Sequence, residues 1–245
     1  MMRRKYFNII LSIPVYGILY LITALAVLFT LLFTFIHNET CVRKVMNLWA
    51  SSLFFVMGKE LKIYGSEHVK KDKRYILLVN HCSLFDIPAV MSFYPEVSWF
   101  GREYLLKIPL FGRVLKVTDY VSMKEAGISN TKRMLNNLVA NSGKHTIAMF
   151  PEGTRTTTGQ VNRFKKGFIY LMRAVKLDIL PVTLNGLYQL KPKTHFYIDF
   201  STKLSVTIHR PIPVDELIDK DDNEIINRVK SQIEKGLRTD TLDNH

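Results

Sequence analysis

The chain has 245 residues, 47% of them hydrophobic, and carries a formal net charge of +13 at pH 7. Its length suits one sizeable α/β domain with a smaller appendage, and the combination of apolar content with positive charge predicts an anionic partner. The basic residues are dispersed and no nucleic-acid-binding motif accompanies them, so a negatively charged membrane surface is the favoured partner. The chain has two cysteines, Cys41 and Cys82, which excludes a disulfide framework or a zinc-binding thiol cluster.

The N-terminal segment is predicted to anchor the chain in a membrane. Residues 9–36 contain no charged side chain and follow Arg3, Arg4 and Lys5, and about 20 apolar residues suffice to cross a bilayer. The run is too long for the apolar region of a secretory signal, and no A-x-A cleavage site follows it. We therefore expect a retained anchor.

Two arrangements of this anchor stay open. A basic start predicts a cytoplasmic N-terminus, and one full crossing would then place the rest of the chain on the opposite side of the membrane. Pro14 and Gly17 could instead end the apolar helix early, and residues 42–57 continue as an amphipathic stretch that contains Trp49. A helical hairpin that dips into one leaflet is therefore the alternative to a span.

The chain changes character after Gly58, which divides it into an N-terminal membrane anchor with an amphipathic helix (residues 1–58) and a second domain (residues 59–245). Short apolar runs alternate there with amphipathic helices, and this pattern predicts an α/β fold with a mostly parallel or mixed sheet flanked by helices and with ligand loops at strand ends. Strands are predicted at residues 61–64, 75–79, 97–100, 120–123, 146–150, 179–184, 196–200 and 204–208. Helices are predicted at residues 129–140, 166–176 and 214–237, and residues 239–245 are expected to form a frayed tail.

The strand at residues 75–79 is followed by Asn80-His81-Cys82-Ser83-Leu84-Phe85-Asp86. A histidine that takes a proton, held by an aspartate that orients it, is a general-base unit. The structural alternative is an imidazole satisfied by a carboxylate at the start of a helix. A nucleophilic Cys82 thiolate paired with His81 is conceivable, but we favour a small residue that packs inward.

The strand at residues 146–150 leads into Phe150-Pro151-Glu152-Gly153-Thr154-Arg155. Arg155 can bind phosphate through both arms of its guanidinium, and Thr154 with nearby N–H groups can add donors. Glu152 can hold the arginine or a hydroxyl of the ligand. Farther along, the positive charges before Gly167 predict anion contact at the start of a helix or, equally, a solvated face. These charges belong to Arg163, Lys165 and Lys166.

Together these motifs resemble the glycerophospholipid acyltransferase family, whose best-known members acylate lysophosphatidic acid. The first motif matches the family's N-H-x4-D pattern, and residues 150–155 match its F-P-E-G-T-R block. Residues 101–112 look like the block between them, and residues 164–167 and 180–182 resemble the later F-K-x-G and proline blocks. The resemblance covers residues 61–186 in the expected order.

The resemblance implies a glycerolipid-acyltransferase-like fold in an acyltransferase domain at residues 59–245. It implies transfer of an acyl group from acyl-CoA or acyl-carrier protein to a lysophospholipid, with 1-acyl-glycerol-3-phosphate as the expected acceptor and phosphatidic acid as product. His81 would be the general base and Asp86 would orient it, without a metal or bound cofactor. The expected location is the inner or cytoplasmic membrane, in contact with membrane lipids and facing the cytosol. The implied substrate-binding residues are Glu152, Gly153, Thr154, Arg155, Arg102 and Lys165.

Two positions depart from the family's pattern. Cys82 stands where many relatives have glutamine, and Lys124-Glu125 stand where an acidic residue is usually followed by an arginine associated with the acceptor phosphate. Another lysolipid or a lyso-aminolipid is therefore an alternative acceptor. A hydrolase and a catalytically silent, membrane-tethered lipid-binding protein are the alternative functions. The intact His81 and Asp86 favour an enzyme.

Overall fold

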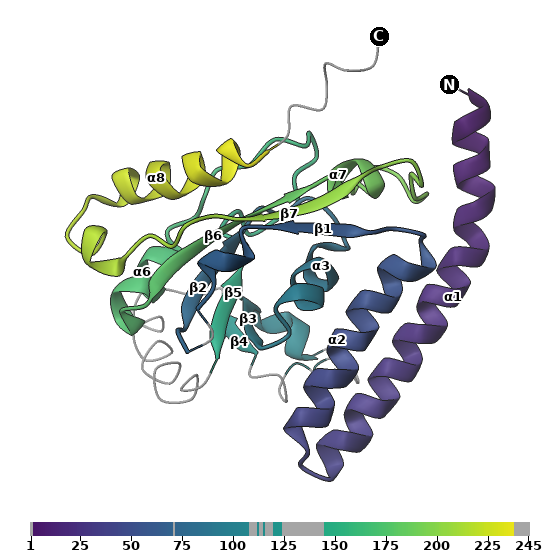
Figure 1. Cartoon of the computed structure of the whole chain (residues 1–245), viewed down its shortest axis with the longest axis horizontal. Coiled ribbons are helices and arrows are strands. Elements are labelled where there is room, and N and C mark those ends of the chain that lie inside the picture. The colour runs from purple at the N-terminus through teal and green to yellow at the C-terminus, as the bar shows by residue number, and fades with distance from the viewer. Residues whose placement is uncertain are drawn as a thin grey trace.

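A mixed sheet forms the centre of the molecule (Figure 1). The structure, a computed structural model, describes residues 2–70, 72–107, 112, 115, 120–123 and 145–237. Within these residues seven strands pair in the order β1-β7-β6-β2-β5-β3-β4, and only β6 and β7 run antiparallel to each other. The strands are β1 (Leu61–Tyr64), β2 (Tyr75–Val79), β3 (Val97–Arg102), β4 (Val121–Met123), β5 (Thr146–Met149), β6 (Asp178–Asn185) and β7 (Leu204–Ile208). The predicted mixed α/β fold is confirmed.

Helices cover both faces of this sheet. One apolar cluster joins the sheet to α1, α2 and α3, and a second joins its other face to α6 and α8. Figure 1 shows α6 and α8 on the side away from the α1–α2 pair. The α-helices are α1 (Met2–Phe35), α2 (Glu39–Val56), α3 (Asp86–Phe93), α6 (Gly167–Val175), α7 (Leu187–Leu190) and α8 (Asp222–Lys235), and the 3₁₀ turns are η1 (Ser66–His68), η2 (Glu103–Lys107) and η3 (Val214–Glu216).

The central strand β2 is buried along its whole length. Successive side chains of a strand point to opposite faces, and here Leu77 and Val79 join the cluster on the α3 side while Ile76 and Leu78 join the cluster on the α8 side. A strand packed on both faces explains why residues 75–79 form an unbroken apolar run. Residues 80–86, which follow β2, are therefore attached to a strand that is packed on both faces.

α1 and α2 form a helical hairpin at one side of the domain (Figure 1). α1 continues through Pro14 and Gly17, so neither residue ends it. Asn38 caps α2, because its side-chain oxygen accepts a hydrogen bond from the N–H of Cys41 (2.9 Å). The Trp49 indole N–H of α2 donates to the Thr23 hydroxyl of α1 (3.1 Å). The two helices thus form one unit.

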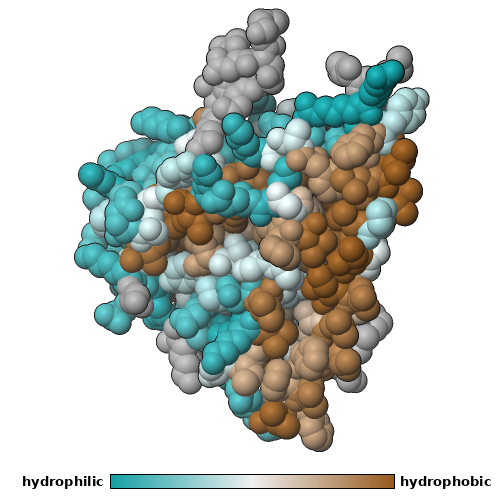
Figure 2. Space-filling model, turned by 45° about the vertical axis from the view of Figure 1, so that its right-hand side comes forward, coloured by the Kyte–Doolittle hydropathy of each residue, from teal (hydrophilic) through white to brown (hydrophobic). Residues whose placement is uncertain are grey.

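Most of α1 turns its apolar side chains away from the protein. The helix from Arg3 to Phe35 is long and apolar enough to cross a membrane, judged by length and composition, and little of it is buried. Figure 2 shows apolar side chains gathered along the hairpin. Apolar exposure on this scale is typical of a surface that contacts a membrane or a partner. The large exposed side chains of α1 include Tyr6, Phe7, Ile10, Ile13, Leu21, Leu28, Phe29 and Leu32.

The predicted strand at residues 196–200 is wrong, because this segment is a loop. Its backbone groups bond to α1 and α7 instead of to a neighbouring strand. The carbonyl of Phe196 accepts the Tyr16 hydroxyl (2.6 Å), and the N–H of Ile198 donates to the Ser12 hydroxyl (2.8 Å). Asp199 forms an ion pair with Arg4 (3.2 Å). The loop therefore fastens α1 to the domain.

The predicted helix at residues 214–237 is also too long. The segment splits into η3 and α8, with a turn between them. Asp221 ends this turn and caps α8, since its carboxylate accepts the N–H of Asn223 (2.8 Å). The other predicted strands and the helix at residues 166–176 are confirmed to within two residues. The predicted helix at 129–140 and the tail at 239–245 lie outside the described residues.

Candidate active site

The two motifs found in the sequence meet at one edge of the sheet. β2 and β5 are parallel neighbours with Leu78 opposite Met149, so the residues that follow each strand emerge side by side. The carboxyl ends of parallel strands are the usual place for ligand loops. This pairing brings His81 next to Phe150 and to the turn that follows it.

His81 and Asp86 form the predicted pair. The Nδ1 of His81 lies 2.8 Å from Oδ2 of Asp86, which is fully buried at the first position of α3. The same carboxylate oxygen accepts the backbone N–H groups of Cys82 (2.6 Å) and Ser83 (2.8 Å). A carboxylate with these donors is acceptor-only, so Nδ1 carries the proton and Nε2 is left with its lone pair. Among the described residues, Nε2 has no hydrogen-bond partner.

The turn after β5 holds the backbone of His81 on both sides. The His81 N–H donates to Oε1 of Glu152 (2.6 Å), and its carbonyl accepts the N–H of Thr156 (2.8 Å). The second oxygen of Glu152 accepts the N–H of Asn162 (2.8 Å), and the side chain is buried. Burial raises the pKa of Glu152, and the two backbone donors oppose that rise. Glu152, predicted to bind substrate, thus has protein partners for both of its oxygens.

An aromatic stack supports the His81 ring. The ring centroids of His81 and Phe150 lie 4.0 Å apart, at an interplanar angle of 14°. Trp99 of β3 in turn stacks on Phe150, with the ring centroids 5.3 Å apart. The His81 side chain is 20% exposed, so one edge of the ring remains open. Neither aromatic residue was predicted as part of the site, although Phe150 belongs to the second motif.

Asn80 extends the sheet by its side chain. Its Oδ1 accepts the N–H of Leu184 (2.7 Å) and its Nδ2 donates to the carbonyl of the same residue (3.1 Å). The side chain therefore replaces one rung of backbone pairing with β6, at the point where β2 ends. This contact directs the following residue, His81, out of the sheet.

Cys82 packs inward, as predicted. Its side chain is buried, and its thiol lies 3.4 Å from Oδ1 of Asp86. Burial and the neighbouring carboxylate raise the pKa of the Cys82 thiol well above its ordinary value. A thiol that stays protonated is a poor nucleophile, so these surroundings do not favour a nucleophilic role for Cys82.

The remaining predicted residues lie around the turn after β5. Gly153 has a φ of +69°, a left-handed conformation that glycine adopts without strain, and a Cβ there would come within 3.1 Å of the Lys165 side chain. Thr154 and Lys165 are exposed and Arg155 is half-buried. Gly153, Thr154, Arg155 and Lys165 are thus brought together.

Two sequence predictions are not tested by this geometry. Arg102 is the last residue of β3, which lies beside β5, but its side chain is not among those the structure describes. Lys124 and Glu125 lie outside the described residues. In the described part of the chain, no three His, Cys, Asp or Glu side chains gather as metal ligands.

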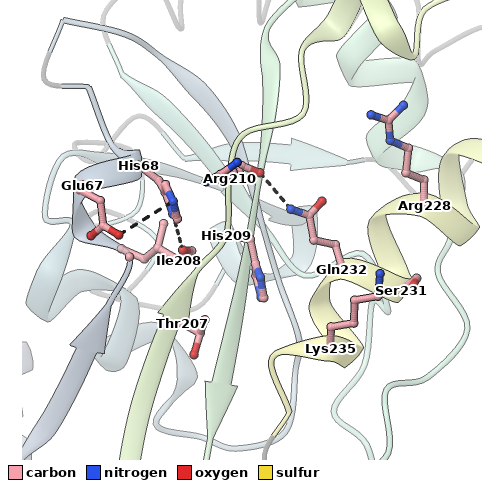
Figure 3. Close-up of a pocket in the computed structure, with 11 residues that line it drawn as sticks. Glu67, His68, Thr207, Ile208, His209, Arg210, Arg228, Ser231, Gln232 and Lys235 are labelled. Atoms are coloured by element: carbon pink, nitrogen blue, oxygen red, sulfur yellow. Dashed lines mark hydrogen bonds and ion pairs between the residues drawn. The ribbon is translucent and has the colours of Figure 1, made fainter.

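A cavity of about 670 Å³ lies elsewhere, between the end of β7 and α8 (Figure 3). Its histidine side chains are engaged by the protein: Nδ1 of His68 bonds to the carbonyl of Ile208 (2.9 Å), and Nε2 of His209 bonds to the Thr183 hydroxyl (2.8 Å). Figure 3 shows Gln232 of α8 reaching the carbonyl of Arg210 across one side of the cavity. No residue of the predicted site lines it.

Comparison with known proteins agrees with this architecture. A family model described as Acyltransferase matches residues 60–185. A solved structure, the 1-acyl-sn-glycerophosphate (LPA) acyltransferase PlsC from Thermotoga maritima, superposes with a TM-score of 0.79 over 94% of this chain and 95% of that chain, at 24% identity. This likeness shows the fold.

Curated relatives share the central part of the sequence. A 1-acyl-sn-glycerol-3-phosphate acyltransferase of Cocos nucifera is 32% identical over 55% of this chain, and one of Limnanthes douglasii is 30% identical over 66%. The chain spans about half the length of these two plant relatives, 44% and 54% respectively. A third, from Borreliella burgdorferi, is 29% identical over 84% of this chain and 80% of its own length. The chain belongs to the acyltransferase family, which includes the 1-acyl-sn-glycerol-3-phosphate acyltransferases.

Proposed function

We propose that the protein transfers an acyl group from acyl-CoA or acyl-carrier protein to the free hydroxyl of 1-acyl-glycerol-3-phosphate, which gives phosphatidic acid. One observation carries the proposal: the imidazole of His81, which is 20% exposed, is bonded through Nδ1 to the buried Asp86, and its Nε2 has no hydrogen-bond partner among the described residues. A general base needs this arrangement. The names of the relatives support the choice of acceptor.

The reaction needs no covalent intermediate with the enzyme. Nε2 of His81 takes the proton of the acceptor hydroxyl as its oxygen attacks the thioester carbonyl. The tetrahedral intermediate then collapses, the C–S bond breaks, and the imidazolium returns the proton to the departing thiolate. The products are an ester and a free thiol. Asp86 holds the imidazole in the required tautomer and stabilises the imidazolium by its charge.

Glu152 acts in this scheme as a positioning residue and not as a substrate ligand. From the turn after β5, its carboxylate accepts the backbone N–H of His81 and the backbone N–H of Asn162, and so fixes the loop that carries His81 against the turn that leads to Arg155. The acceptor phosphate binds to Arg155, with the exposed Thr154, the Gly153 turn and Lys165 around it. Arg102 is assigned to the same pocket from its place at the end of β3.

The α1–α2 hairpin delivers the domain to its lipid substrates. The apolar side chains of α1 insert into the membrane, and the basic residues of the chain favour an anionic surface. Because acyl-CoA and acyl-carrier protein are cytosolic, the active site faces the cytosol. A hairpin joined by direct contacts between its helices is compatible with insertion into one leaflet.

An acceptor panel tests the proposed function. The full chain in anionic vesicles is incubated with acyl-CoA or acyl-carrier protein as donor and with lysophosphatidic acid, other lysophospholipids or no acceptor. We expect phosphatidic acid and free thiol in equal amounts, with the highest kcat/KM for lysophosphatidic acid. Free fatty acid formed equally well without acceptor would identify a hydrolase and contradict the proposal. Absence of thiol release with every acceptor would indicate a silent lipid-binding protein.

Replacement of Glu152 by glutamine should lower kcat by about 10-fold or more. An amide accepts only one of the two backbone N–H groups that the carboxylate binds, and a buried donor left without a partner costs about 1–3 kcal/mol. Because one of these donors belongs to His81, the imidazole shifts and kcat falls while KM for lysophosphatidic acid changes little. Steady-state kinetics check this. Glu96→Gln, which removes an exposed carboxylate, is the matched control. A change confined to KM for lysophosphatidic acid would show that Glu152 binds substrate and does not position His81.

A further inference from the structure

The turn that carries Arg155 runs beside α7 and the residue after it, Lys191. The Tyr188 hydroxyl of α7 donates to the carbonyl of Thr157 (2.7 Å). A Cβ added at Gly159, whose φ is +86°, would come within 3.0 Å of the Tyr188 ring. Segments 154–159 and 187–191 are therefore in direct contact.

Both segments are bonded to the loop that carries the proposed general base. Thr156, next to Arg155, donates its N–H to the carbonyl of His81 (2.8 Å). The carbonyl of Lys191 accepts the hydroxyl of Ser83 from the same loop (2.8 Å). Arg155 and Lys191 are thus attached to the catalytic loop at two points, on either side of Cys82.

Among the described residues, the Lys191 ammonium has hydrogen-bond partners for two of its three N–H groups. It is half-buried and donates to the carbonyls of Pro192 (3.0 Å) and His195, which uses two of its three N–H donors. Burial lowers the pKa of Lys191, and the charge of Arg155 lowers it further. Within the described residues, no carboxylate pairs with either cation.

Two neighbouring cations without a counter-ion favour an anion that contacts both. The nearby acids cannot serve, since Asp86 and Glu152 face backbone donors. A phosphate monoester carries close to two negative charges at neutral pH and several acceptor oxygens, so it suits a guanidinium and an ammonium together. A neutral or zwitterionic headgroup does not offer this match.

We propose that Lys191 is a specificity-determining residue that binds, together with Arg155, the phosphate monoester of the acceptor. This inference rests on the proposed function and names a residue outside both sequence motifs. Lys191 acts on acceptor affinity, while His81 and Asp86 act on the chemical step. Because the loop after Lys191 is also bonded to α1 through Phe196 and Ile198, the phosphate site is held in place relative to the membrane anchor.

The test compares Lys191→Met with Lys193→Met, an exposed lysine of the same loop. We expect Lys191→Met to raise KM for lysophosphatidic acid by about 10-fold or more, the range of one charge-assisted hydrogen bond, with kcat within about 3-fold of wild type. Lys193→Met should leave both constants unchanged. Lys191→Arg should restore most of the affinity, and Arg155→Ala should raise the same KM. An equal loss of kcat/KM with a neutral lysolipid would overturn the role of Lys191.

A binding measurement separates this inference from the proposed function. Glycerol 3-phosphate should raise the Tm of the detergent-solubilised wild type and of Lys193→Met, but not of Lys191→Met. If Lys191→Met fails to fold, Lys191→Gln removes the charge but keeps two N–H donors, and it decides the same question. A wild type that forms no phosphatidic acid would overturn the proposed function alone. Equal stabilisation of wild type and Lys191→Met by glycerol 3-phosphate would overturn the inference alone.

Discussion

Replacement of His81 by alanine should reduce acyl transfer from acyl-CoA to lysophosphatidic acid by about 10³-fold, within the range of general-base catalysis. The imidazole is the basic group at the open edge of the site, and its Nδ1 is already committed to Asp86 (2.8 Å). Without it, the acceptor hydroxyl must lose its proton to water. The release of free thiol, followed in a continuous assay, measures the loss, and KM for both substrates should change little.

The control for this variant must remove an imidazole without touching the site. His68 is suitable, because its ring bonds to the carbonyl of Ile208 beside the remote cavity. His68→Ala should retain transfer at close to the wild-type rate, and both variants should sediment with vesicles as the wild type does. Turnover of His81→Ala at a rate near that of His68→Ala would refute the proposed mechanism.

Replacement of Asp86 by asparagine should lower kcat by about 10² to 10³-fold while the protein remains folded. Three N–H groups bond to Oδ2 of Asp86, and the other oxygen faces the Cys82 thiol. The amide oxygen of asparagine can replace Oδ2, so the tautomer of His81 is kept. The lost quantity is the negative charge that stabilises the imidazolium. Steady-state kinetics should show a change in kcat with little change in KM.

Asp86→Ala serves to separate charge from structure. Alanine leaves the N–H groups of Cys82 and Ser83 without an acceptor in a fully buried place, at a cost of about 1–3 kcal/mol for each donor. Its Tm should therefore fall well below that of Asp86→Asn. Asp72→Asn, at an exposed carboxylate, is the matched control. If Asp86→Asn kept wild-type kcat, the carboxylate would have only a structural role.

The strands that carry the site could be predicted from local sequence. β2 and β5 are short apolar runs bounded by polar residues, because a strand covered on both faces must be apolar throughout. The alternation of strands and helices predicts a mostly parallel or mixed sheet with ligand loops at strand ends. It does not predict that β5 pairs with β2, because β3 and β4 lie between them in the chain, so the meeting of the two motifs at one sheet edge is known only from the fold. His81 and Asp86, five residues apart, lie within a single turn and were the most local part of the site.

The partners of these residues depend on contacts between segments far apart in the chain. Glu152 bonds to the N–H of His81, 71 positions away, and Asn80 bonds to Leu184, 104 positions away. An acidic side chain in a turn carries no local sign that its acceptors face backbone donors and not a ligand. The positioning role proposed for Glu152 therefore rests on the folded arrangement alone.

The two wrong elements have different causes. Residues 196–200 alternate in a way that suits a strand, but a strand needs a neighbour, and here the N–H of Ile198 and the carbonyl of Phe196 bond to side chains of α1. Propensity cannot reveal which partner takes these groups. Residues 214–237 have helical character throughout, yet the Asp221 cap starts α8 late.

The sequence by itself pointed to the acyltransferase family and to the proposed general base, because His81 and Asp86 are close together in the chain and the family motifs are continuous. The candidate membrane helix α1 could be predicted in the same way, because its length and lack of charge are local properties. Only the tertiary structure decided which groups support that chemistry. It turned Glu152 inward, stacked Phe150 and Trp99 behind His81, and brought the segment that ends in Lys191 into contact with the turn that carries Arg155. These contacts come from strand pairing and loop packing, which bring together residues that no periodicity or spacing connects.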